Sequence, residues 1–186
     1  MSYTPNDTDA VLPERLRSGD STAFEELFLR HYAAVYRVSY GVVGNTQEAE
    51  DLAQETFTAL YRQPPRLDDP GALGAWLYRA AVNRAYNALR SKQRLQRRLE
   101  RVEPEQQSDP QDEYVRREER ERVRAALARL PERTAKLLLL RHAGLAYAEI
   151  AAALQVAPGS VGTLLVRAER AFIQVYEQMG LPDNQG

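Results

Sequence analysis

Residues 23–43 read AFEELFLRHYAAVYRVSYGVV, and this stretch gives the first indication of the fold class. It carries almost no strand signal. Asp20 to Thr22 offers candidate N-caps, and Glu25 stands three residues after Thr22 as in a capping box. Gly44 then supplies a stop signal. We therefore expect a long helix between these two signals.

Two further helices are predicted downstream. Asn45, with Glu48 three residues later, opens a helix that stops before two consecutive prolines at 64 and 65. An aspartate and a proline at 69 and 70 then supply a cap and an N1 proline for a long helix over about 71–101. We expect these three helices to form one compact domain, residues 1–102.

A change of composition separates this domain from a second one. Residues 103–113 read EPEQQSDPQDE, with two prolines, no basic residue and no large apolar residue, so they cannot bury enough surface to fold alone. Four helices are predicted beyond this segment, over about 114–129, 131–144, 147–154 and 158–179. The chain is thus predicted to be all-α, with small helical domains at 1–102 and 114–186 joined by an acidic flexible linker at 103–113.

Composition narrows the function classes. The chain has 186 residues, 44% of them hydrophobic, which is enough to build real cores. It has no cysteine, and His31 and His142 lie too far apart in sequence to suggest a ligand pair, so we expect neither a metal nor a cofactor. The first residues lack a signal-peptide pattern and no stretch approaches eighteen consecutive apolar residues. We expect a cytoplasmic protein without membrane insertion.

The predicted helix at 45–62 carries an acidic strip opposite its buried stripe. The apolar positions recur at three- and four-residue spacing, namely Ala49, Leu52, Ala53, Phe57, Leu60 and Tyr61. Glu48, Asp51 and Glu55 fall on one side of the other face, and Gln54 flanks them. Such a strip is either a solvated face or a docking surface for a basic partner.

The long helix combines amides, aromatic rings and arginines on one face. Its packed side is predicted to hold Leu73, Leu77, Ala80, Ala81, Ala85 and Ala88. The opposite face holds Arg79, Asn83, Tyr86, Asn87, Arg90 and Arg94, with Trp76 at its edge. These groups suit single-stranded DNA, because rings stack on unpaired bases, amides read base edges and guanidinium groups bind phosphates. Trp76 and Tyr86 could equally be core residues.

The last helices have the spacing of a helix-turn-helix. Apolar residues space a short helix, a tight turn and a second helix, at Ile150, Leu154, Val156, Val161, Leu165, Ala168 and Phe172. The outward side of the second helix is predicted to carry Ser160, Thr163, Val166, Arg167 and Arg170. This motif favours DNA binding, although such helix pairs also occur as plain structure.

In this order, the pieces resemble the extracytoplasmic-function (ECF) sigma factors, group IV of the bacterial sigma-70 family, from about residue 15 to about residue 178. The resemblance rests on GDSTAFEELFLRHY (19–32), EAEDLAQETFTALYR (48–62), AWLYRAAVNRAYNALRSKQR (75–94) and LPERTAKLLLLRHAGLAYAEIAAALQVAPGSVGTLLVRAERA (130–171). It implies a transcription initiation factor and not an enzyme. The two domains then correspond to sigma domains two and four.

The resemblance also implies partners and roles. Asp51, Gln54 and Glu55 stand where the family binds the coiled coil of the RNA polymerase β′ subunit, and the second domain would meet the β flap. The loop at 65–74 and the polar face of the long helix would bind the minus-ten element of promoter DNA and flip a base out of the stack. The acidic linker would thread the RNA channel, and an anti-sigma factor is an expected partner.

The predicted helix-turn-helix departs from the family pattern. Gly162 and Leu164 stand where the family commonly has a basic residue, and Ala146 and Ala157 stand where it has serine caps. Loss of a good N-cap costs about 1 kcal/mol. Contact with the minus-35 element would then depend on Ser160, Thr163, Arg167 and Arg170, with help from Arg141.

Three rival interpretations remain open on the sequence. A sigma-like regulator could occupy polymerase or an anti-sigma protein without directing initiation, which the thin recognition helix would favour. A helix-turn-helix repressor with an unrelated front domain is disfavoured by the acidic strip at 48–55. An enzyme is the least favoured class, because no phosphate loop, metal spacing or nucleophile–base pair is present in the sequence.

Overall fold

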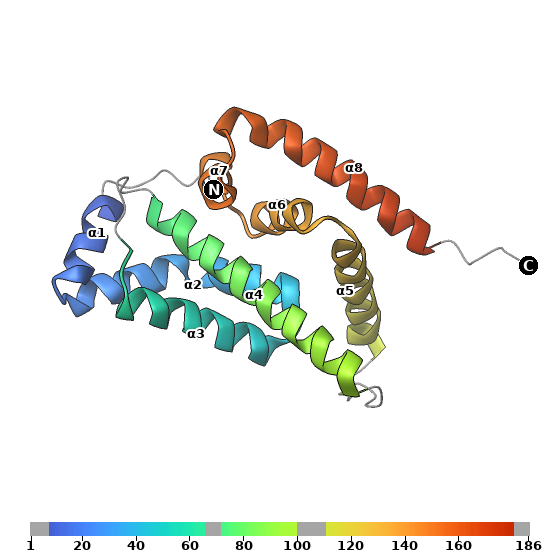
Figure 1. Cartoon of the computed structure of the whole chain (residues 1–186), viewed down its shortest axis with the longest axis horizontal. Helices are drawn as coiled ribbons and strands as arrows, with labels where there is room; N and C mark the ends of the chain where they lie inside the picture. Colours follow the sequence, from blue (N-terminus) through green and yellow to red (C-terminus); the bar gives the residue numbers. More distant parts are fainter. Residues whose placement is uncertain (1–7, 66–71, 100–110, 181–186) are drawn as a thin grey trace, which may run out of the picture.

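The computed structural model describes residues 8–65, 72–99 and 111–180, and within these ranges every regular element is a helix. The all-α prediction is confirmed. An N-terminal bundle comprises α1 (Thr8–Arg17), α2 (Ser21–Val43), α3 (Thr46–Arg62) and α4 (Ala72–Leu99). A C-terminal bundle comprises α5 (Gln111–Arg129), α6 (Glu132–His142), α7 (Tyr147–Leu154), the 3-10 turn η1 (Pro158–Ser160) and α8 (Val161–Gly180) (Figure 1).

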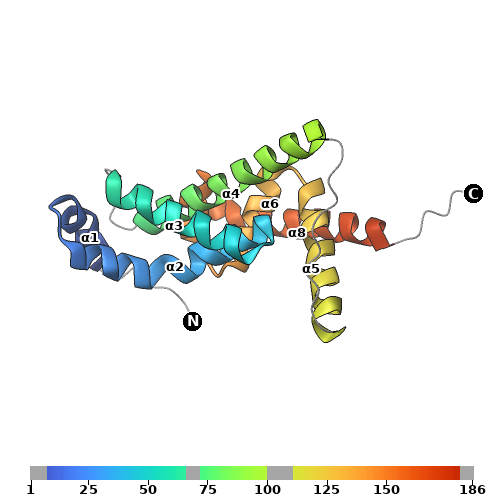
Figure 2. The same cartoon turned by 90° about the horizontal axis from the view of Figure 1, so that it is seen from below.

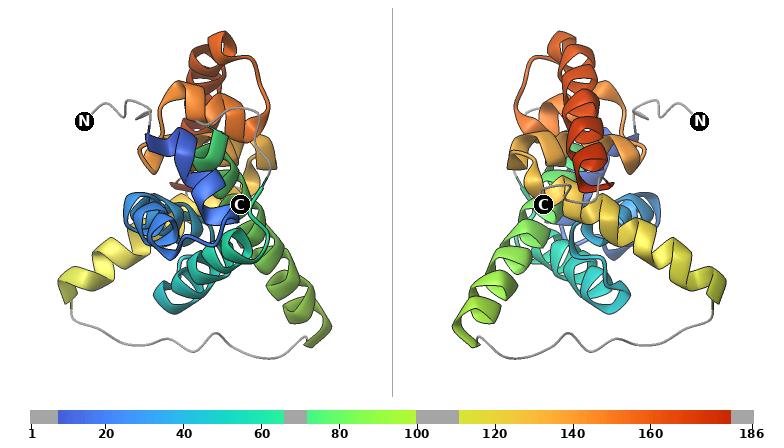
Figure 3. Two further views of the ribbon diagram at one scale, coloured as in Figure 1. Left: turned by 90° about the vertical axis from the view of Figure 1, so that its left-hand side faces the viewer. Right: turned by 90° about the vertical axis from the view of Figure 1, so that its right-hand side faces the viewer.

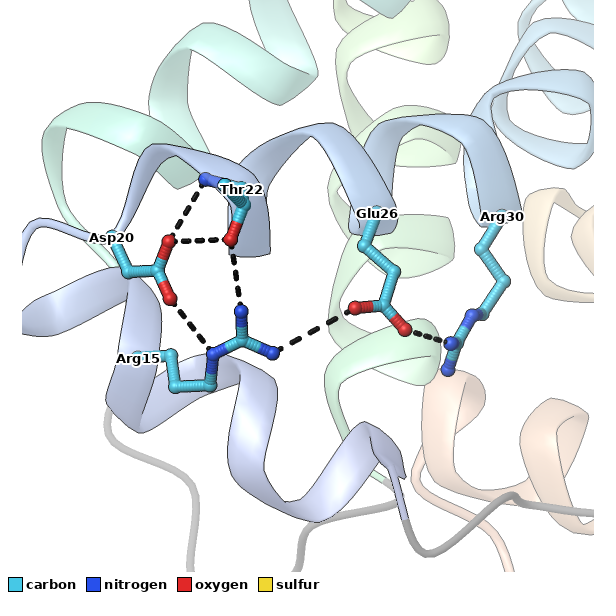
Figure 4. Close-up of polar contacts among 5 residues, drawn as sticks. All are labelled: Arg15, Asp20, Thr22, Glu26 and Arg30. Atoms are coloured by element: carbon cyan, nitrogen blue, oxygen red, sulfur yellow. Dashed lines mark hydrogen bonds and ion pairs between the residues drawn. The ribbon is translucent and has the colours of Figure 1, made fainter.

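Asp20 is the N-cap of α2. Its carboxylate accepts from the backbone N–H of Thr22 at 2.9 Å and from Arg15 Nε at 2.8 Å (Figure 4). The Thr22 hydroxyl also donates to this carboxylate and has the largest effect on its pKa. Together these bonds lower the pKa of Asp20 from 3.8 to about 2. The cap therefore stabilises the fold fully above pH 3.8, and this contribution is lost as the pH falls towards 2. A capping box led by Thr22 is wrong, because Thr22 lies inside α2.

Further side chains extend this network along α2. Glu26 lies between Arg15, at 3.8 Å, and Arg30, one helical turn further on (Figure 4). At the other end, Gly44 closes the helix in the left-handed conformation, with φ 70°. The predicted end of this helix is therefore confirmed. Glycine suits this position because it adopts positive φ without steric strain.

The N-terminal bundle packs around α2, which contacts α1, α3 and α4. Phe57 of α3 is buried, with its ring 4.9 Å from that of Phe28 and 6.3 Å from those of Phe24 and Tyr32. The predicted stripe on α3 is buried from Ala49 to Leu60, but Tyr61 is 60% exposed. Tyr61 sits at the edge of the stripe, where one side of its ring meets Phe24 and the rest faces solvent.

Replacing Asn45 by alanine is expected to reduce the free energy of unfolding by about 1 kcal/mol. Asn45 caps α3, because its side-chain oxygen accepts from the backbone N–H of Glu48 at 2.8 Å. Asn45→Asp, which keeps the acceptor, serves as the control. Urea unfolding followed by circular dichroism measures both variants, and equal losses would contradict the capping role.

Three features differ from the sequence prediction. Helix α1 was not predicted, yet its Leu12 and Leu16 are buried against the N-terminal bundle. Helix α5 begins at Gln111, so the last three residues of the predicted linker are helical. On the packed side of α4, Leu73, Leu77, Ala81 and Ala85 are buried, whereas Ala80 and Ala88 are only half-buried. The rest of the linker and residues 66–71 lie outside the described residues.

The C-terminal bundle contains the predicted helix-turn-helix. Helix α7 and the segment Pro158–Gly180 meet at an angle of 111°, and Gln155 turns the chain with φ 54°. Ile150, Val161, Leu165 and Ala168 are buried in the bundle. Leu154, Val156 and Phe172 are half-buried. None of the described helices is long and apolar enough to cross a membrane alone.

The two bundles pack against each other. Helix α7 crosses α4 and packs against it, and α6 contacts α2 (Figures 1 and 2). End-on views show the C-terminal bundle covering one side of the N-terminal bundle (Figure 3). Buried residues from both bundles belong to one hydrophobic cluster. Their close packing is a feature that the predicted linker did not suggest.

Candidate docking and nucleic-acid interfaces

The acidic strip lies on the outer face of α3. Asp51, Gln54 and Glu55 are exposed and line an open cleft of about 690 Å³. Arg62 of α3 and Arg84 of α4 line the same cleft. The cleft therefore presents carboxylates beside guanidinium groups. A basic partner helix can bind there by forming ion pairs with the carboxylates in place of these guanidinium groups.

Glu48, the fourth predicted member of the strip, has a different environment. Its carboxylate pairs with Lys92 of α4 at 3.2 Å, and its backbone N–H donates to the side-chain oxygen of Asn45. It does not line the cleft. The structure thus brings three of the four predicted docking residues together and gives Glu48 a contact between α3 and α4.

Helix α4 presents its predicted polar face towards the C-terminal bundle. Arg79 Nε donates to the carbonyl oxygen of Ala153 at 2.8 Å. The amide oxygen of Asn83 accepts from Lys136 Nζ at 2.7 Å, and the same ammonium lies 5.3 Å from the ring centre of Tyr86. The prediction that these residues share one face is therefore consistent with the structure, but α6 and α7 contact that face.

The rest of this face is more open. Arg90 donates to Glu132 of α6 at 2.6 Å and to Asn87 at 2.7 Å. Asn87 and Arg94 are exposed. Trp76 is half-buried and packs against the hydrophobic cluster. It therefore belongs partly to the core and lies at the edge of the polar face, the two positions that the sequence left open.

Electrostatic effects follow from this packing. Burial, with a smaller effect of Glu132, raises the pKa of Tyr86 to about 12, so its hydroxyl stays protonated at neutral pH. The hydrogen bond from Lys136 is the main cause that lowers the pKa of Glu132. Glu132 thus stays charged and holds both Lys136, at 2.7 Å, and Arg90.

The predicted recognition surface on α8 is only partly available. Thr163, Arg167 and Arg170 are exposed, as is Val166, whereas Ser160 is half-buried and donates to the Ala157 carbonyl at 2.7 Å. The Leu164 side chain, between these positions, packs against the hydrophobic cluster.

The other helix-turn-helix positions explain how the missing caps are tolerated. Ala146 provides no side-chain cap, but its backbone N–H donates to Glu149 at 2.7 Å. Ala157 likewise provides none, and proline follows it at the first position of η1. Arg141 donates to the Leu145 carbonyl at 3.2 Å and lies 5.4 Å from the ring centre of Tyr147, so it braces the turn.

Sequence reasoning missed the residues that join the bundles. Arg37, Glu132 and Lys136 make interbundle contacts, yet each reads as an ordinary charged position on its own helix. The sequence does show that Glu132 and Lys136 are four residues apart, a spacing that allows them to pair within α6. That spacing does not reveal a contact with the other bundle.

Comparisons with known proteins define the class. A model of Sigma-70 region 2 matches residues 27–95, which include most of α2, all of α3 and most of α4. A model of Sigma-70, region 4 matches residues 120–172, which include the helix-turn-helix. The two matches thus place the chain in the sigma-70 class of initiation subunits.

Individual relatives agree with this class. The chain is 30% identical over 176 residues to the RNA polymerase sigma-H factor of Pseudomonas aeruginosa, covering 88% of this chain and 91% of that protein. It is 32% identical over 177 residues to the ECF RNA polymerase sigma-E factor of Escherichia coli, covering 89% and 92%. The chain belongs to the ECF sigma factors of the sigma-70 family, so it is a sigma factor for transcription initiation.

Solved structures share the fold. CnrH, in complex with the cytosolic domain of CnrY, matches with a TM-score of 0.63 at 23% identity, over 91% of this chain and 97% of that chain. The sigma factor RpoE of Bartonella quintana, in complex with the anti-sigma factor NepR, matches with a TM-score of 0.55 at 19% identity, over 83% and 96%.

Proposed function

We propose that this sigma factor docks on core RNA polymerase through Asp51, Gln54 and Glu55 and reads promoter DNA with α4 and α8. The observation that carries the docking proposal is the exposed strip on α3, whose three side chains line one open cleft. The partner surface in this proposal is the β′ coiled coil, a basic helical element. The C-terminal bundle would meet the β flap.

In the same proposal, α4 captures the melted non-template strand at the minus-ten element. Its polar face offers the Asn83 amide, the Tyr86 ring and the Arg79 guanidinium within three turns of one helix. Unstacking a base costs a few kcal/mol, and binding energy to the open strand offsets this cost without any hydrolysis. We therefore assign no catalytic step to the chain.

The C-terminal bundle is proposed to contact the minus-35 element weakly. Three of its predicted DNA contacts, Thr163, Arg167 and Arg170, are exposed on α8. Phosphate contacts supply most of the affinity of such modules, and two arginines provide few of them. Tethering to polymerase raises the local concentration of the module, so a weak contact can still select a promoter in the holoenzyme.

An anti-sigma factor is a further proposed partner. Both structural relatives were solved in complexes, one with the cytosolic domain of CnrY and one with the anti-sigma factor NepR. A chain that binds core polymerase acts in the cytoplasm, where we place this one.

The function is tested by transcription from a library of genomic promoters with purified core polymerase. We expect the chain to direct initiation from a defined subset of promoters. Binding to core without any promoter-dependent transcript would instead favour a sigma-like regulator.

Replacing Asn83 by alanine is expected to reduce open-complex formation about tenfold or more, with core binding unchanged. A lost amide contact to a base edge is worth about 1–3 kcal/mol. Permanganate footprinting measures melting, and co-purification measures core binding. Gln93→Ala, at an exposed position further along α4, is the matched control. Normal melting by a folded Asn83→Ala variant would reassign this face of α4 to structure.

A further inference from the structure

We propose that a groove between the two bundles is a binding site for a small amphipathic anion, a molecule with an apolar body and one anionic group. The groove has a volume of about 640 Å³, and its walls come from α2, α5, α6 and α8. Pockets for small molecules commonly have volumes of about 300–1,000 Å³ and mainly apolar walls. The proposal does not depend on the proposed function, because no residue of the groove belongs to the acidic strip or to the polar face of α4.

Apolar side chains form the interior of the groove. Tyr36 and Tyr40 are one turn apart on α2, and their rings stack with centroids 5.9 Å apart and planes inclined by 18°. The groove is also lined by Leu127 of α5, Leu138 and Leu139 of α6, and Phe172 of α8. An apolar body placed here is favoured because its surface and that of these side chains leave water.

Close packing of α2 and α6 fixes the shape of the groove. A Cβ atom built on Gly41 of α2 would lie 2.6 Å from Cδ2 of Leu139, so a larger residue at position 41 would push the two helices apart. Arg37 joins the same helices, because its Nη2 donates to the carbonyl of Ala143, the C-cap of α6, at 2.9 Å. A molecule bound in the groove would therefore contact both bundles.

Arginines outnumber carboxylates along the groove. It is lined by Arg37, Arg120, Arg124 and Arg141, together with two carboxylates, Glu119 and Glu169. Arg37 and Arg141 already donate to backbone carbonyl oxygens, those of Ala143 and Leu145. The remaining two arginines both lie on α5, which therefore forms the cationic edge of the groove.

Arg120 and Arg124 are the groups that we assign to the anion. They are four residues apart on α5, so their side chains leave the helix on one face. Among the residues that the structure describes, neither makes a hydrogen bond or an ion pair. Like charges at this spacing repel each other, and an anion held between them replaces the repulsion with two charge-assisted hydrogen bonds.

Gly44 gives Arg124 its path across the end of α2. A Cβ atom built on Gly44 would lie 2.8 Å from Cδ of Arg124, so the glycine that ends α2 also leaves room for the arginine side chain. Arg124 is half-buried. Its attraction for an anion is stronger than that of an exposed arginine, because water screens charges less beside apolar walls.

The two carboxylates leave this cationic edge unneutralised. Glu119 accepts from the Tyr176 hydroxyl and pairs with Arg122 at 3.8 Å. Glu169 is exposed on α8 and pairs with no described arginine. A neutral apolar molecule would cover the two arginines of α5 without giving them a partner, and a cation would be repelled. The groove therefore selects an apolar molecule that carries a negative charge.

Two fluorescent probes test this selection on the full chain. Anilinonaphthalene sulfonate and its neutral parent, phenylnaphthylamine, differ only in the sulfonate, and both fluoresce in apolar surroundings. We expect the wild-type chain to bind the sulfonate probe with one-to-one stoichiometry. Arg120→Gln with Arg124→Gln should weaken that binding about tenfold or more, because charge-assisted hydrogen bonds are lost, and should leave the neutral probe unaffected.

The matched control is Arg129→Gln with Arg133→Gln, which removes two exposed arginines outside the groove and should change neither affinity. A second variant, Val123→Trp, places a larger side chain in the groove and should weaken both probes. Helical circular dichroism shows whether each variant folds. Unchanged binding of the sulfonate probe by either folded groove variant would place the probe elsewhere and overturn the proposal.

Fatty-acid competition identifies the apolar body that the groove accepts. Below its micellar concentration, dodecanoate is expected to displace the sulfonate probe and to raise the midpoint of thermal unfolding, because a ligand of the folded chain stabilises it. Dodecanol, which lacks the charge, should do neither. Displacement by naphthoate in place of dodecanoate would keep the proposal and restrict the ligand to aromatic acids. Failure of both acids to displace the probe, or a lowered midpoint with each, would overturn it.

Discussion

Replacing Asp51 and Glu55 together by arginine is expected to abolish co-purification of the chain with core RNA polymerase. Truncating one partner of a buried charge pair at an interface costs about 2–5 kcal/mol, or roughly 30-fold in affinity at the lower end. Two reversals also repel a basic partner. Because Arg62 and Arg84 line the same cleft, the substituted surface would carry four cations.

The control for this prediction carries the same charge change elsewhere. Glu118→Arg with Glu121→Arg reverses two exposed carboxylates on α5 and should leave co-purification intact. Helical circular dichroism shows that both variants fold. If the folded α3 variant still co-purified normally, core polymerase would have to bind another surface, and the strip would be a solvated face.

Local signals account for much of the correct prediction of the fold. Gly44 ends α2 and Asn45 caps α3, because the conformations required at those points are set by the residues themselves. The acidic strip was found for the same reason, since exposure on a short amphipathic helix follows from its angular position. In both cases the pattern and its structural cause lie within one helix.

The missed features depend on distant partners. Helix α1 has a low amphipathic signal and contains Pro13, so only packing against α2 reveals it. The contacts that cover α4 join residues far apart in sequence, by 53 positions for Lys136 and Asn83 and by 74 for Arg79 and Ala153. No periodicity within α4 distinguishes a face that binds DNA from one that binds another helix.

This ambiguity follows from the chemistry of the α4 face. Arginines, amides and an aromatic ring bind phosphates and bases, and the same groups bind helix C-termini, carboxylates and a lysine ammonium. A surface built to read a strand can therefore be satisfied within the chain by Glu132, Lys136 and the end of α7.

Replacing Phe57 by alanine is expected to reduce the free energy of unfolding by about 3–5 kcal/mol, the cost of removing a large buried ring and leaving a cavity. Phe57 is 2% exposed and meets three aromatic rings of α2. Tyr61→Ala, four residues further along the same predicted stripe, should cost less than about 1.5 kcal/mol. Tyr61 is 60% exposed, and its ring makes an edge contact with Phe24.

Urea unfolding of the two variants, followed by circular dichroism, measures this difference directly. Sequence periodicity places both rings on one buried stripe and so predicts similar losses, whereas the structure predicts a loss at least twice as large at Phe57. A comparable loss at Tyr61 would mean that the packing of α3 on α2 extends over its last turn. Such packing would require α3 to be rotated about its axis. Asp51 and Glu55 lie on the same helix, so the acidic strip would rotate with both rings.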